Sequence, residues 1–478
     1  MVDEARKAPE PVYRTSAEPR LRLLIPLVVA GATLMESLDQ TIIVTAIPQM
    51  AASLGESPLR LNVAITSYLL SLAVFIPISG WIADRFGART VFCLAVGVFT
   101  VASALCGMAV NLPMLVATRI LQGLGGALMS PVGRLVLLKS FPRSEIVVAM
   151  GYVMMPAMIG PAAGPLLGGF LTTYASWRWI FFINVPFGIL GIILAWTYFD
   201  NFREDVLARF DFKGFVLCGI GLAALQLALE FAGRQRLSGG FEASFIAIAG
   251  LSLSAYAFYA RRKPEPVIDL SLFRLKTFRI GNLAGTICRI GFMSTSFLLP
   301  LFLQIPLGLT AFQSGLITSV LAVGAFGMRT MTPRVLRQLG FRTVLLVDGG
   351  IVSMMMMALS FISPGTPHWA LAFYLLCLGF FRSIIYTSLS NLGYADLMGR
   401  QISTGSSLAS VMQQLSASLG VALSATLLGL LVGPSGTPSV ADFRPVFLLM
   451  ALFPLASLFW FARLNQEDGA HMTGHRRS

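Results

Sequence analysis

The sequence predicts an all-α, polytopic membrane protein. Hydrophobic residues make up 56% of the 478 residues and charged residues 12%, and the mean hydropathy is +0.77. A soluble domain of this length has no core large enough to bury so much apolar surface. The apolar residues also fall in windows of roughly 20, which is the length that an α-helix needs to cross a bilayer.

Breaks rich in Gly, Pro and charged residues separate fourteen such windows. The predicted spans are approximately 23–48, 61–83, 90–110, 112–133, 147–171, 179–199, 213–232, 241–260, 279–303, 311–330, 342–362, 368–390, 402–431 and 443–462. Because basic residues accumulate on the cytoplasmic side of a membrane, the positions of Lys and Arg test this assignment of spans. With the N-terminus inside, 27 of the 35 fall on the cytoplasmic side, five outside and three within spans. Both termini are therefore expected in the cytoplasm, as in a multi-pass protein of the bacterial inner membrane.

The net charge of +13 does not indicate a nucleic-acid partner, because the basic residues form short clusters between apolar spans. All five cysteines fall within predicted spans and the three histidines form no cluster, so neither disulfides nor a metal site is predicted. No nucleophile and base pair, phosphate-binding loop or soluble domain is recognisable, so the chain is not expected to be an enzyme.

The first span contains two acids, Glu36 and Asp39. A carboxylate at the centre of a helix in lipid costs roughly 2.5–3.5 kcal/mol, so such residues usually face a water-filled cavity and have a function. Three residues apart, the two acids lie on one helical face. The alternative is a structural pair bonded to neighbouring helices.

The loop after the second span reads GWIADRFGAR from Gly80 to Arg89. Its pattern resembles the signature of the major facilitator superfamily between the second and third spans, although Thr90 stands where a second basic residue is common. The resemblance implies a cytoplasmic gate motif, with residues Gly80, Asp84, Arg85, Gly87 and Arg89. The alternative is a solvated turn whose charges only set topology.

The fourth span contains Arg119 and Gln122 in the run RILQGLGGA. This stretch is similar to the fourth-helix motif of the superfamily, whose buried Arg is linked to proton transfer. At about 1.5 Å per residue, Asp39 and Arg119 lie roughly 13 and 12 Å from the outer ends of their spans, so they are at matching depth. Arg119 is therefore assigned with Asp39 and Glu36 to proton coupling, the alternative being a purely structural Arg.

The fifth span matches the antiporter motif of proton-coupled exporters at every named position. These positions are Gly151, Gly160, Pro161, Gly164, Pro165, Gly168 and Gly169. Glycines four residues apart present a flat stripe for close helix packing, and prolines bend the helix. The stripe by itself suits any tight pair of membrane helices, whereas the whole spacing is specific.

The segments Leu38–Pro48 and Trp177–Pro186 resemble the fourteen-span drug:proton antiporters, the EmrB/QacA-like group, although Val44 and Thr45 depart from its first-helix pattern. SLGESP at 53–58 and SGWIADRFG at 79–87 are most similar to its MdtD/HsrA-like branch. The resemblance implies the major facilitator fold, with two six-helix bundles and two extra central helices. The expected parts are a cytoplasmic tail at 1–22, a bundle at 23–200, a linker with two helices at 201–263, a bundle at 264–463 and a cytoplasmic tail at 464–478.

Members of the superfamily line their cavity mainly with the first and fourth helix of each bundle, and all three intramembrane arginines fall on such helices. The expected cavity residues are Glu36, Asp39, Gln122, Arg289 and Arg382, where Arg382 has snorkelling to the inner surface as its alternative. Asp348 is expected to be a structural partner of Arg342.

Taken together, these features predict a proton-coupled efflux antiporter of the multidrug type. The expected cargo is a small amphipathic molecule that is neutral, zwitterionic or anionic, and the proton gradient is the energy source in place of a cofactor. The alternative is a dedicated exporter of an organic anion or a metal-carboxylate chelate. A channel is disfavoured by the antiporter motif. The expected partners are the substrate, protons and lipid, and the chain is expected to be a monomer.

Overall fold

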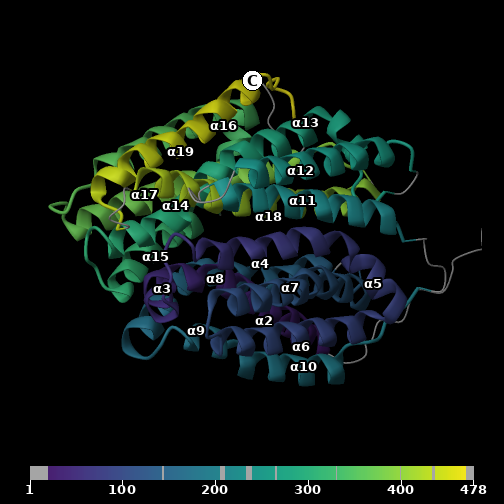
Figure 1. Cartoon of the computed structure of the whole chain (residues 1–478). Helices are drawn as coiled ribbons and strands as arrows, with labels where there is room; N and C mark the ends of the chain where they lie inside the picture. Colours follow the sequence, from purple (N-terminus) through teal and green to yellow (C-terminus); the bar gives the residue numbers. More distant parts are fainter. Residues whose placement is uncertain are drawn as a thin grey trace, which may run out of the picture.

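The computed structural model describes residues 20–142, 145–204, 210–232, 239–263, 266–329, 331–398, 400–432 and 437–469. Most of the N-terminal tail, residues 1–19, and the end of the C-terminal tail, 470–478, lie outside the described residues. Figure 1 shows long helices that run side by side in two groups, with α2 to α10 below and α11 to α19 above. The described residues contain helices and no strand, which confirms the predicted all-α class.

The first group follows the first six predicted spans. Its helices are α2 (Leu21–Ile42), η1 (Ile43–Ala46), α3 (Ile47–Leu54), α4 (Asn62–Phe75), η2 (Ile76–Ile78), α5 (Ser79–Phe86), α6 (Ala88–Gly107), α7 (Leu112–Ser140), α8 (Ile146–Tyr174), α9 (Trp179–Phe182) and α10 (Asn184–Tyr198). We call this group the N-half.

Two further helices, α11 (Phe212–Ala232) and α12 (Gly239–Ala260), form an insert. The last group, the C-half, comprises η3 (Leu270–Arg274), α13 (Lys276–Arg279), the π-helix η4 (Ile280–Ala284), α14 (Gly285–Gln304), α15 (Ala311–Arg329), α16 (Thr332–Ala358), η5 (Leu359–Phe361), α17 (His368–Tyr394), α18 (Arg400–Leu431) and α19 (Val440–Phe461).

Thirteen helical stretches of the described residues are long and apolar enough to cross a membrane. The 29-residue helix α8 occupies the remaining predicted span, 147–171. Large apolar side chains such as Leu94, Ile193 and Phe459 are more than half exposed. A protein in water rarely shows so much apolar surface, and lipid chains provide the matching surroundings.

Local sequence accounts for several helix ends and bends. Asn111 caps α7 by accepting a hydrogen bond from the Met114 amide at 2.9 Å. Ser439 and Asp442 form a capping box at the start of α19. Gly340 has φ +71° and produces a kink in α16. The helical segment before the kink begins at Thr332, about ten residues before the predicted span 342–362.

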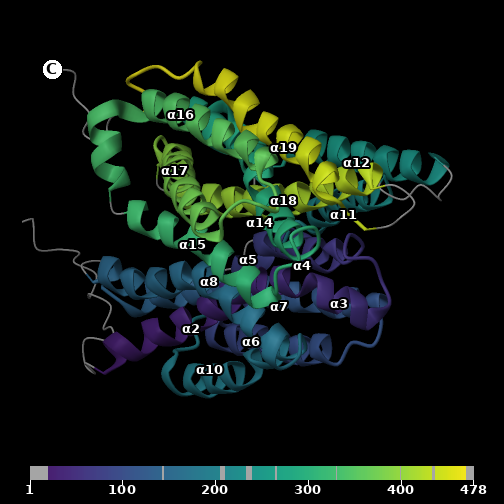
Figure 2. The same ribbon diagram turned by 90° about the vertical axis from the view of Figure 1, so that its left-hand side faces the viewer.

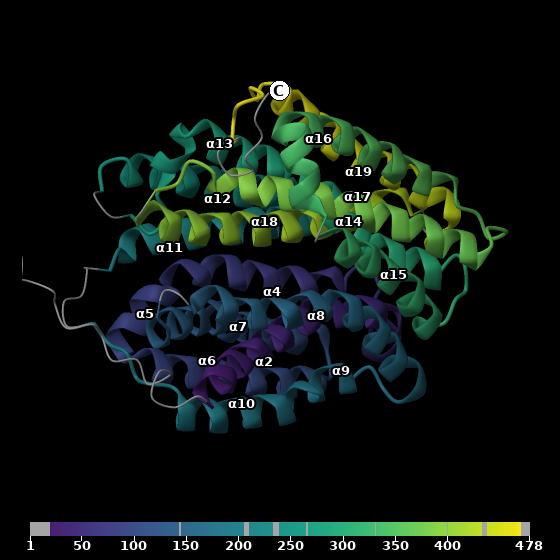
Figure 3. The same ribbon diagram turned by 180° about the vertical axis from the view of Figure 1, so that it is seen from behind.

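The insert joins the two halves along one side. Figure 3 shows α11 beside α4 of the N-half and α18 of the C-half. Ser418 on α18 donates a hydrogen bond to Oε1 of the buried Gln226 on α11 at 2.7 Å. Thr426 donates to the carbonyl of Leu229 at 3.1 Å. Both bonds attach α11 to the C-half.

Besides a bond from Ser418 on α18 to the Thr66 carbonyl of α4 at 3.4 Å, the direct hydrogen bonds between the halves, among the described residues, lie toward the end of the bundle that contains α3. Gln304 on α14 accepts from Gln49 at 3.2 Å and donates to the Thr45 carbonyl at 3.0 Å. The Phe312 amide donates to Thr173 at 3.1 Å, and Figure 2 shows α15 beside α8 here. The halves are therefore held together at the end where α3 lies.

Candidate functional site

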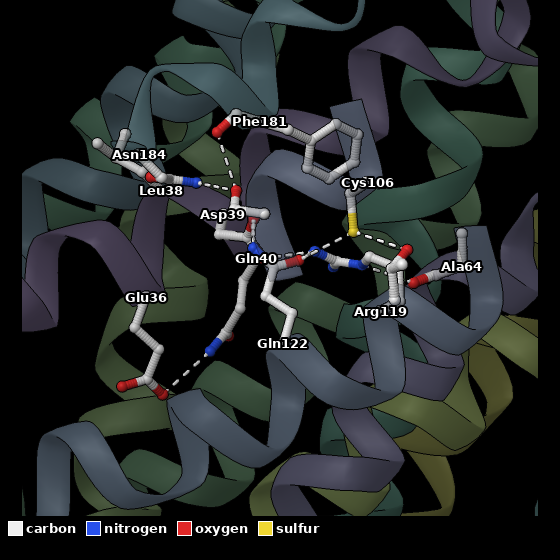
Figure 4. Close-up of polar contacts among 12 residues, drawn as sticks. Glu36, Leu38, Asp39, Gln40, Ala64, Cys106, Arg119, Gln122, Phe181 and Asn184 are labelled. Atoms are coloured by element: carbon white, nitrogen blue, oxygen red, sulfur yellow. Dashed lines mark hydrogen bonds and ion pairs between the residues drawn. The ribbon is translucent and has the colours of Figure 1, made fainter. Parts of the chain in front are cut away.

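A buried ion pair inside the N-half joins two of the predicted site residues. Arg119 Nη1 on α7 lies 2.6 Å from Asp39 Oδ2 on α2. Gln122, one turn after Arg119, donates to Asp39 Oδ1 at 2.8 Å and accepts from Arg119 Nη1 at 2.8 Å. Figure 4 shows the three side chains converging. The structure thus brings together the acid and the Arg that the depth estimate matched.

The pair is closed off from solvent. Asp39 is 1% exposed and Arg119 and Gln122 are 0% exposed. Arg119 Nε donates to the Ala64 carbonyl at 2.9 Å, and its Cζ lies 4.2 Å from the centre of the Tyr68 ring. In such a low-dielectric site, loss of either charged partner is expensive, since the other charge is left buried. Asp39 and Gln122, predicted to line a cavity, face Arg119 and each other in this structure.

Glu36 has a different environment from Asp39. It is half-buried, and it accepts hydrogen bonds from Ser130 on α7 and from Gln40. Figure 4 places its side chain with Gln40, away from the Asp39 and Arg119 pair. Because its partners are neutral, Glu36 can gain or lose a proton without breaking an ion pair.

The predicted gate motif forms the end of α5 and the turn into α6. Asp84 Oδ1 lies 3.9 Å from Lys139 Nζ on α7, and Lys139 also contacts Glu204 at 2.5 Å. That hydrogen bond and charge hold the pKa of Glu204 below its usual value. Gly87 has φ +94°, and a Cβ there would lie 2.2 Å from Oδ1 of Asn201.

The arginines of the motif contact aromatic rings. Arg85 Cζ lies 5.5 Å from the ring of Trp81, and Arg89 Cζ lies 5.0 Å from the ring of Trp196 on α10. Gly80 has open space where a Cβ would point. In the described residues, the motif is therefore attached to α7, to α10 and to the segment that follows α10.

The glycine stripe of α8 packs against two different helices. A Cβ at Gly160 would lie 2.0 Å from Ser37 Oγ, and one at Gly164 would lie 2.0 Å from Thr41 Oγ1, both on α2. A Cβ at Gly169 would lie 2.3 Å from the Ala311 carbonyl oxygen of α15, in the C-half. A Cβ at Gly151 would meet nothing within 4 Å. The middle of the stripe therefore brings α8 close to α2 of its own half, and the end of the stripe brings it close to α15 of the C-half.

Pro161 and Pro165 lie within α8, which remains one helix from Ile146 to Tyr174. The carbonyl oxygen of Pro165 lies 2.1 Å from the position of a Cβ on Gly315 of α15. A glycine on the partner helix is thus needed where Pro165 approaches it.

The two other predicted arginines lie in the C-half. Arg289 on α14 is 4% exposed, and its Nε and Nη1 have no hydrogen-bond acceptor among the described residues. Arg382 on α17 is half-buried; its Nη2 lies 3.5 Å from Ser296 Oγ and its Cζ lies 5.3 Å from the Phe292 ring.

The expected pairing of Asp348 with Arg342 was wrong. Asp348 is 4% exposed, and neither carboxylate oxygen has a hydrogen-bond donor among the described residues, although the Ile385 backbone lies close. Six residues, about one and two-thirds helical turns, separate positions 342 and 348, so the two side chains leave α16 in different directions. Among the described residues, no three His, Cys, Asp or Glu side chains are grouped to hold a metal ion.

Comparison with known proteins identifies the family. A model described as Major Facilitator Superfamily matches residues 29–421. The chain belongs to the major facilitator superfamily. It is 39% identical over 457 residues to "Putative multidrug resistance protein MdtD" of Escherichia fergusonii, covering 94% of this chain and 96% of that one. It is also 39% identical to the protein of the same name from Serratia proteamaculans, covering 84% of both chains. The predicted MdtD-like branch is confirmed.

Solved structures of transporters share the fold. A bacterial homologue of the lysosomal transporter Spinster, in an inward-facing and unoccupied conformation, has a TM-score of 0.64 at 16% identity and covers 96% of this chain and 99% of that one. The nucleoside transporter NupG has a TM-score of 0.62 at 14% identity, with 92% and 98% coverage. With the family and the apolar helices, this likeness identifies the chain as a multi-pass membrane transporter and not an enzyme.

Proposed function

We propose that the protein is a proton-coupled efflux antiporter for small amphipathic molecules of the multidrug type. The observation that carries this proposal is the buried pair of Asp39 and Arg119 within the N-half. An ion pair with so little access to solvent is weak evidence for stability, because its desolvation offsets much of its attraction. Intramembrane ion pairs of this kind often mark proton pathways. The names of the MdtD relatives support a drug-like cargo.

In the proposed mechanism, Asp39 binds either a proton or the positive charge of Arg119. Contact with the guanidinium favours the carboxylate, whereas separation in a low-dielectric interior favours the neutral acid. A cargo that holds the pair together thus competes with the proton, and by linkage the proton weakens cargo binding equally. We propose Glu36, one helical turn before Asp39 on α2, as the second titrating group, since its hydrogen-bond partners Gln40 and Ser130 are neutral.

Alternating access requires that the halves close at one end while they open at the other. The hydrogen bonds of Gln304 with Gln49 and Thr45 support closure at the α3 end. We propose that the protein lies in the bacterial inner membrane with both termini in the cytoplasm. The α3 end then faces the outer side of that membrane. The gate residues Asp84, Arg85 and Arg89 then lie at the inner end, where we propose that they latch the opposite state.

The proton gradient supplies enough energy for this exchange. One proton that enters down a potential of 100 mV contributes about 2.3 kcal/mol, and each pH unit adds about 1.4 kcal/mol. A factor of ten in concentration costs about 1.4 kcal/mol. One proton per cargo therefore sustains concentration ratios of tens to hundreds.

Proton release from purified protein tests the coupling. The probes are three amphiphiles that share a pyrenylbutyl group and end in a carboxylate, a primary amide or a trimethylammonium group; we call them the pyrene panel. In weakly buffered detergent solution, at least one probe is expected to release about one proton per bound molecule from the wild type. Asp39→Asn is expected to abolish release, and Glu36→Gln to reduce it less, since the hydrogen-bond partners of Glu36 are the neutral Ser130 and Gln40.

Undiminished release from Asp39→Asn would disprove the role of this residue. No release from the wild type with any probe would contradict proton exchange for amphiphiles. The trimethylammonium probe as the strongest ligand would contradict the expected preference for neutral, zwitterionic or anionic cargo.

Cross-linking the α3 end tests alternating access. A short bis-methanethiosulfonate joins cysteines introduced at positions 49 and 304. This cross-link is expected to reduce counterflow of the pyrene probes across vesicle membranes at least tenfold, because the halves can no longer separate there. A thiol reductant is expected to restore it. The control is a cysteine pair at Met108 and Asn111, two exposed positions in one loop of the N-half. Counterflow that survives complete cross-linking of 49 to 304 would refute opening at this end.

One observation favours the alternative function, a dedicated exporter of an organic anion or a metal-carboxylate chelate. Arg289 is buried with two N–H groups that have no acceptor among the described residues. Vesicles with a fixed pH gradient distinguish the two functions. A multidrug exporter accepts several unrelated amphiphiles that compete with one another, whereas a dedicated exporter accepts one anion or chelate.

A further inference from the structure

The three intramembrane arginines have unequal partners. Arg119 has the Asp39 carboxylate at 2.6 Å, and Arg382, half-buried, has the Ser296 hydroxyl at 3.5 Å. Arg289 is 4% exposed and its Cζ lies 5.6 Å from the centre of the Tyr386 ring, yet the described residues offer no acceptor to its Nε or Nη1. A buried donor without an acceptor costs about 1–3 kcal/mol, and more when the group is charged. Arg289 is therefore the cation that an incoming anion would stabilise most.

Arg289 lines a small, partly open chamber between three helices of the C-half. The chamber has a volume of about 40 Å³, and its polar lining comprises Asn282, Arg289, Ser390, Tyr394, Ser410 and Gln413. Sites for whole drug-sized ligands are about 300–1,000 Å³. One water occupies about 30 Å³ in the liquid, so the chamber has room for little more than one water-sized group. It therefore suits only the charged end of a drug-sized molecule.

The backbone around the chamber is irregular. The segment Ile280–Ala284, which carries Asn282, is π-helical, and π-helical turns occur frequently at functional sites. A Cβ at Gly281 would lie 2.8 Å from the Gly393 nitrogen, and one at Gly393 would lie 3.1 Å from Asn282 Nδ2. Two glycines thus let the π-helix approach α17, and Asn282, whose Nδ2 donates to the Phe278 carbonyl at 3.0 Å, lines the chamber together with Arg289.

We propose that the Arg289 chamber binds the carboxylate of the exported molecule, whose apolar part remains outside it. This inference rests on the proposed function and specifies its cargo as a monocarboxylate amphiphile. A guanidinium offers parallel N–H donors that match the two oxygens of a carboxylate. The Asn282 amide and the Ser410 and Tyr394 hydroxyl groups also line the chamber and can donate hydrogen bonds. Asp39 and Arg119 then handle the proton in one half while Arg289 holds the anion in the other.

Equilibrium binding of the pyrene panel tests the chamber without any transport step. In detergent, the wild type is expected to bind the carboxylate at least tenfold more tightly than the amide and the trimethylammonium probe. Arg289→Gln is expected to remove this preference and to change the affinity for the amide less than threefold. Arg289→Lys retains part of the preference, since an ammonium is a point charge without the planar fork.

Two further variants separate the chamber from general effects of charge or folding. Arg444→Gln removes an exposed Arg of the C-half and is expected to keep the wild-type preference. Gly393→Ala narrows the chamber by pushing on Asn282 and is expected to weaken carboxylate binding at least threefold with no change in charge. The preference is measured at equilibrium without a proton readout, whereas coupling is measured as proton release, so failure of proton coupling and failure of the chamber give different results.

Two further experiments test whether the chamber binds a free inorganic anion or a lipid headgroup. Inorganic phosphate at 10-fold excess is expected not to displace the carboxylate probe, and nanodiscs with phosphatidylglycerol are expected to give the same affinity as nanodiscs with phosphatidylcholine alone. Displacement by either would assign the chamber to a free anion or a lipid headgroup and overturn the proposal. Equal binding of the three probes, no binding of the carboxylate, or an unchanged preference in Arg289→Gln would also overturn it.

Discussion

Arg119→Leu is expected to destabilise the folded protein by about 3–5 kcal/mol, because it leaves the buried Asp39 carboxylate without its cation. The Ala64 carbonyl and the Gln122 side chain lose their hydrogen bonds from the guanidinium as well. The measurement is the thermal unfolding midpoint in detergent, together with the yield of monodisperse protein. We expect a lower midpoint than for any single exposed Arg variant, with Arg60→Leu as the control.

A double variant separates stability from function. In Asp39→Leu combined with Arg119→Leu, both charges are gone, and replacing a buried ion pair by apolar residues is often neutral or stabilising. We expect the double variant to recover most of the lost midpoint and to release no proton with any member of the pyrene panel. Stability that is unchanged by Arg119→Leu alone would mean that water reaches the pair. Proton release by the double variant would refute the proposed coupling.

Gly164→Val is expected to reduce the yield of folded protein by at least fivefold. A Cβ at this position would lie 2.0 Å from Thr41 Oγ1, and also 2.9 Å from Thr41 Cβ and 3.2 Å from the Ile42 nitrogen of α2. Rotation of the Thr41 side chain removes only the first contact, so α8 must move away from α2. Overpacking of this kind typically costs 1–3 kcal/mol. The yield of detergent-extracted, monodisperse protein measures the effect.

The same helix provides the matched control. Gly151→Val introduces an identical change where nothing lies within 4 Å, and we expect its yield to be within a factor of two of the wild type. Thr41→Ala combined with Gly164→Ala is expected to recover part of the yield lost by Gly164→Ala alone, since the nearest atom is removed. Equal losses at Gly151 and Gly164 would show that helix propensity, and not contact with α2, sets the requirement for glycine.

The sequence determined the class of protein because bilayer thickness fixes the length of an apolar helix. The predicted span 112–133 lies within α7, for example, and the glycine spacing of α8 indicated a helix that packs closely against neighbours. Arg119 and Asp39 were matched by depth alone, since a rise per residue converts sequence position into distance along the membrane normal. Such inferences need only one helix at a time.

The partners of each side chain were decided by the tertiary structure. The sequence assigned Glu36 and Asp39 to one helical face, yet Asp39 meets Arg119 while Glu36 accepts from Ser130 and Gln40. The sequence also offered no sign that Asp348 is buried without a hydrogen-bond donor among the described residues. It placed Arg289 on a cavity-lining helix but did not indicate which polar groups surround it. The depth of a residue in the membrane follows from its position along one helix. The partner of its side chain is decided only when packing fixes the rotation and tilt of the neighbouring helices.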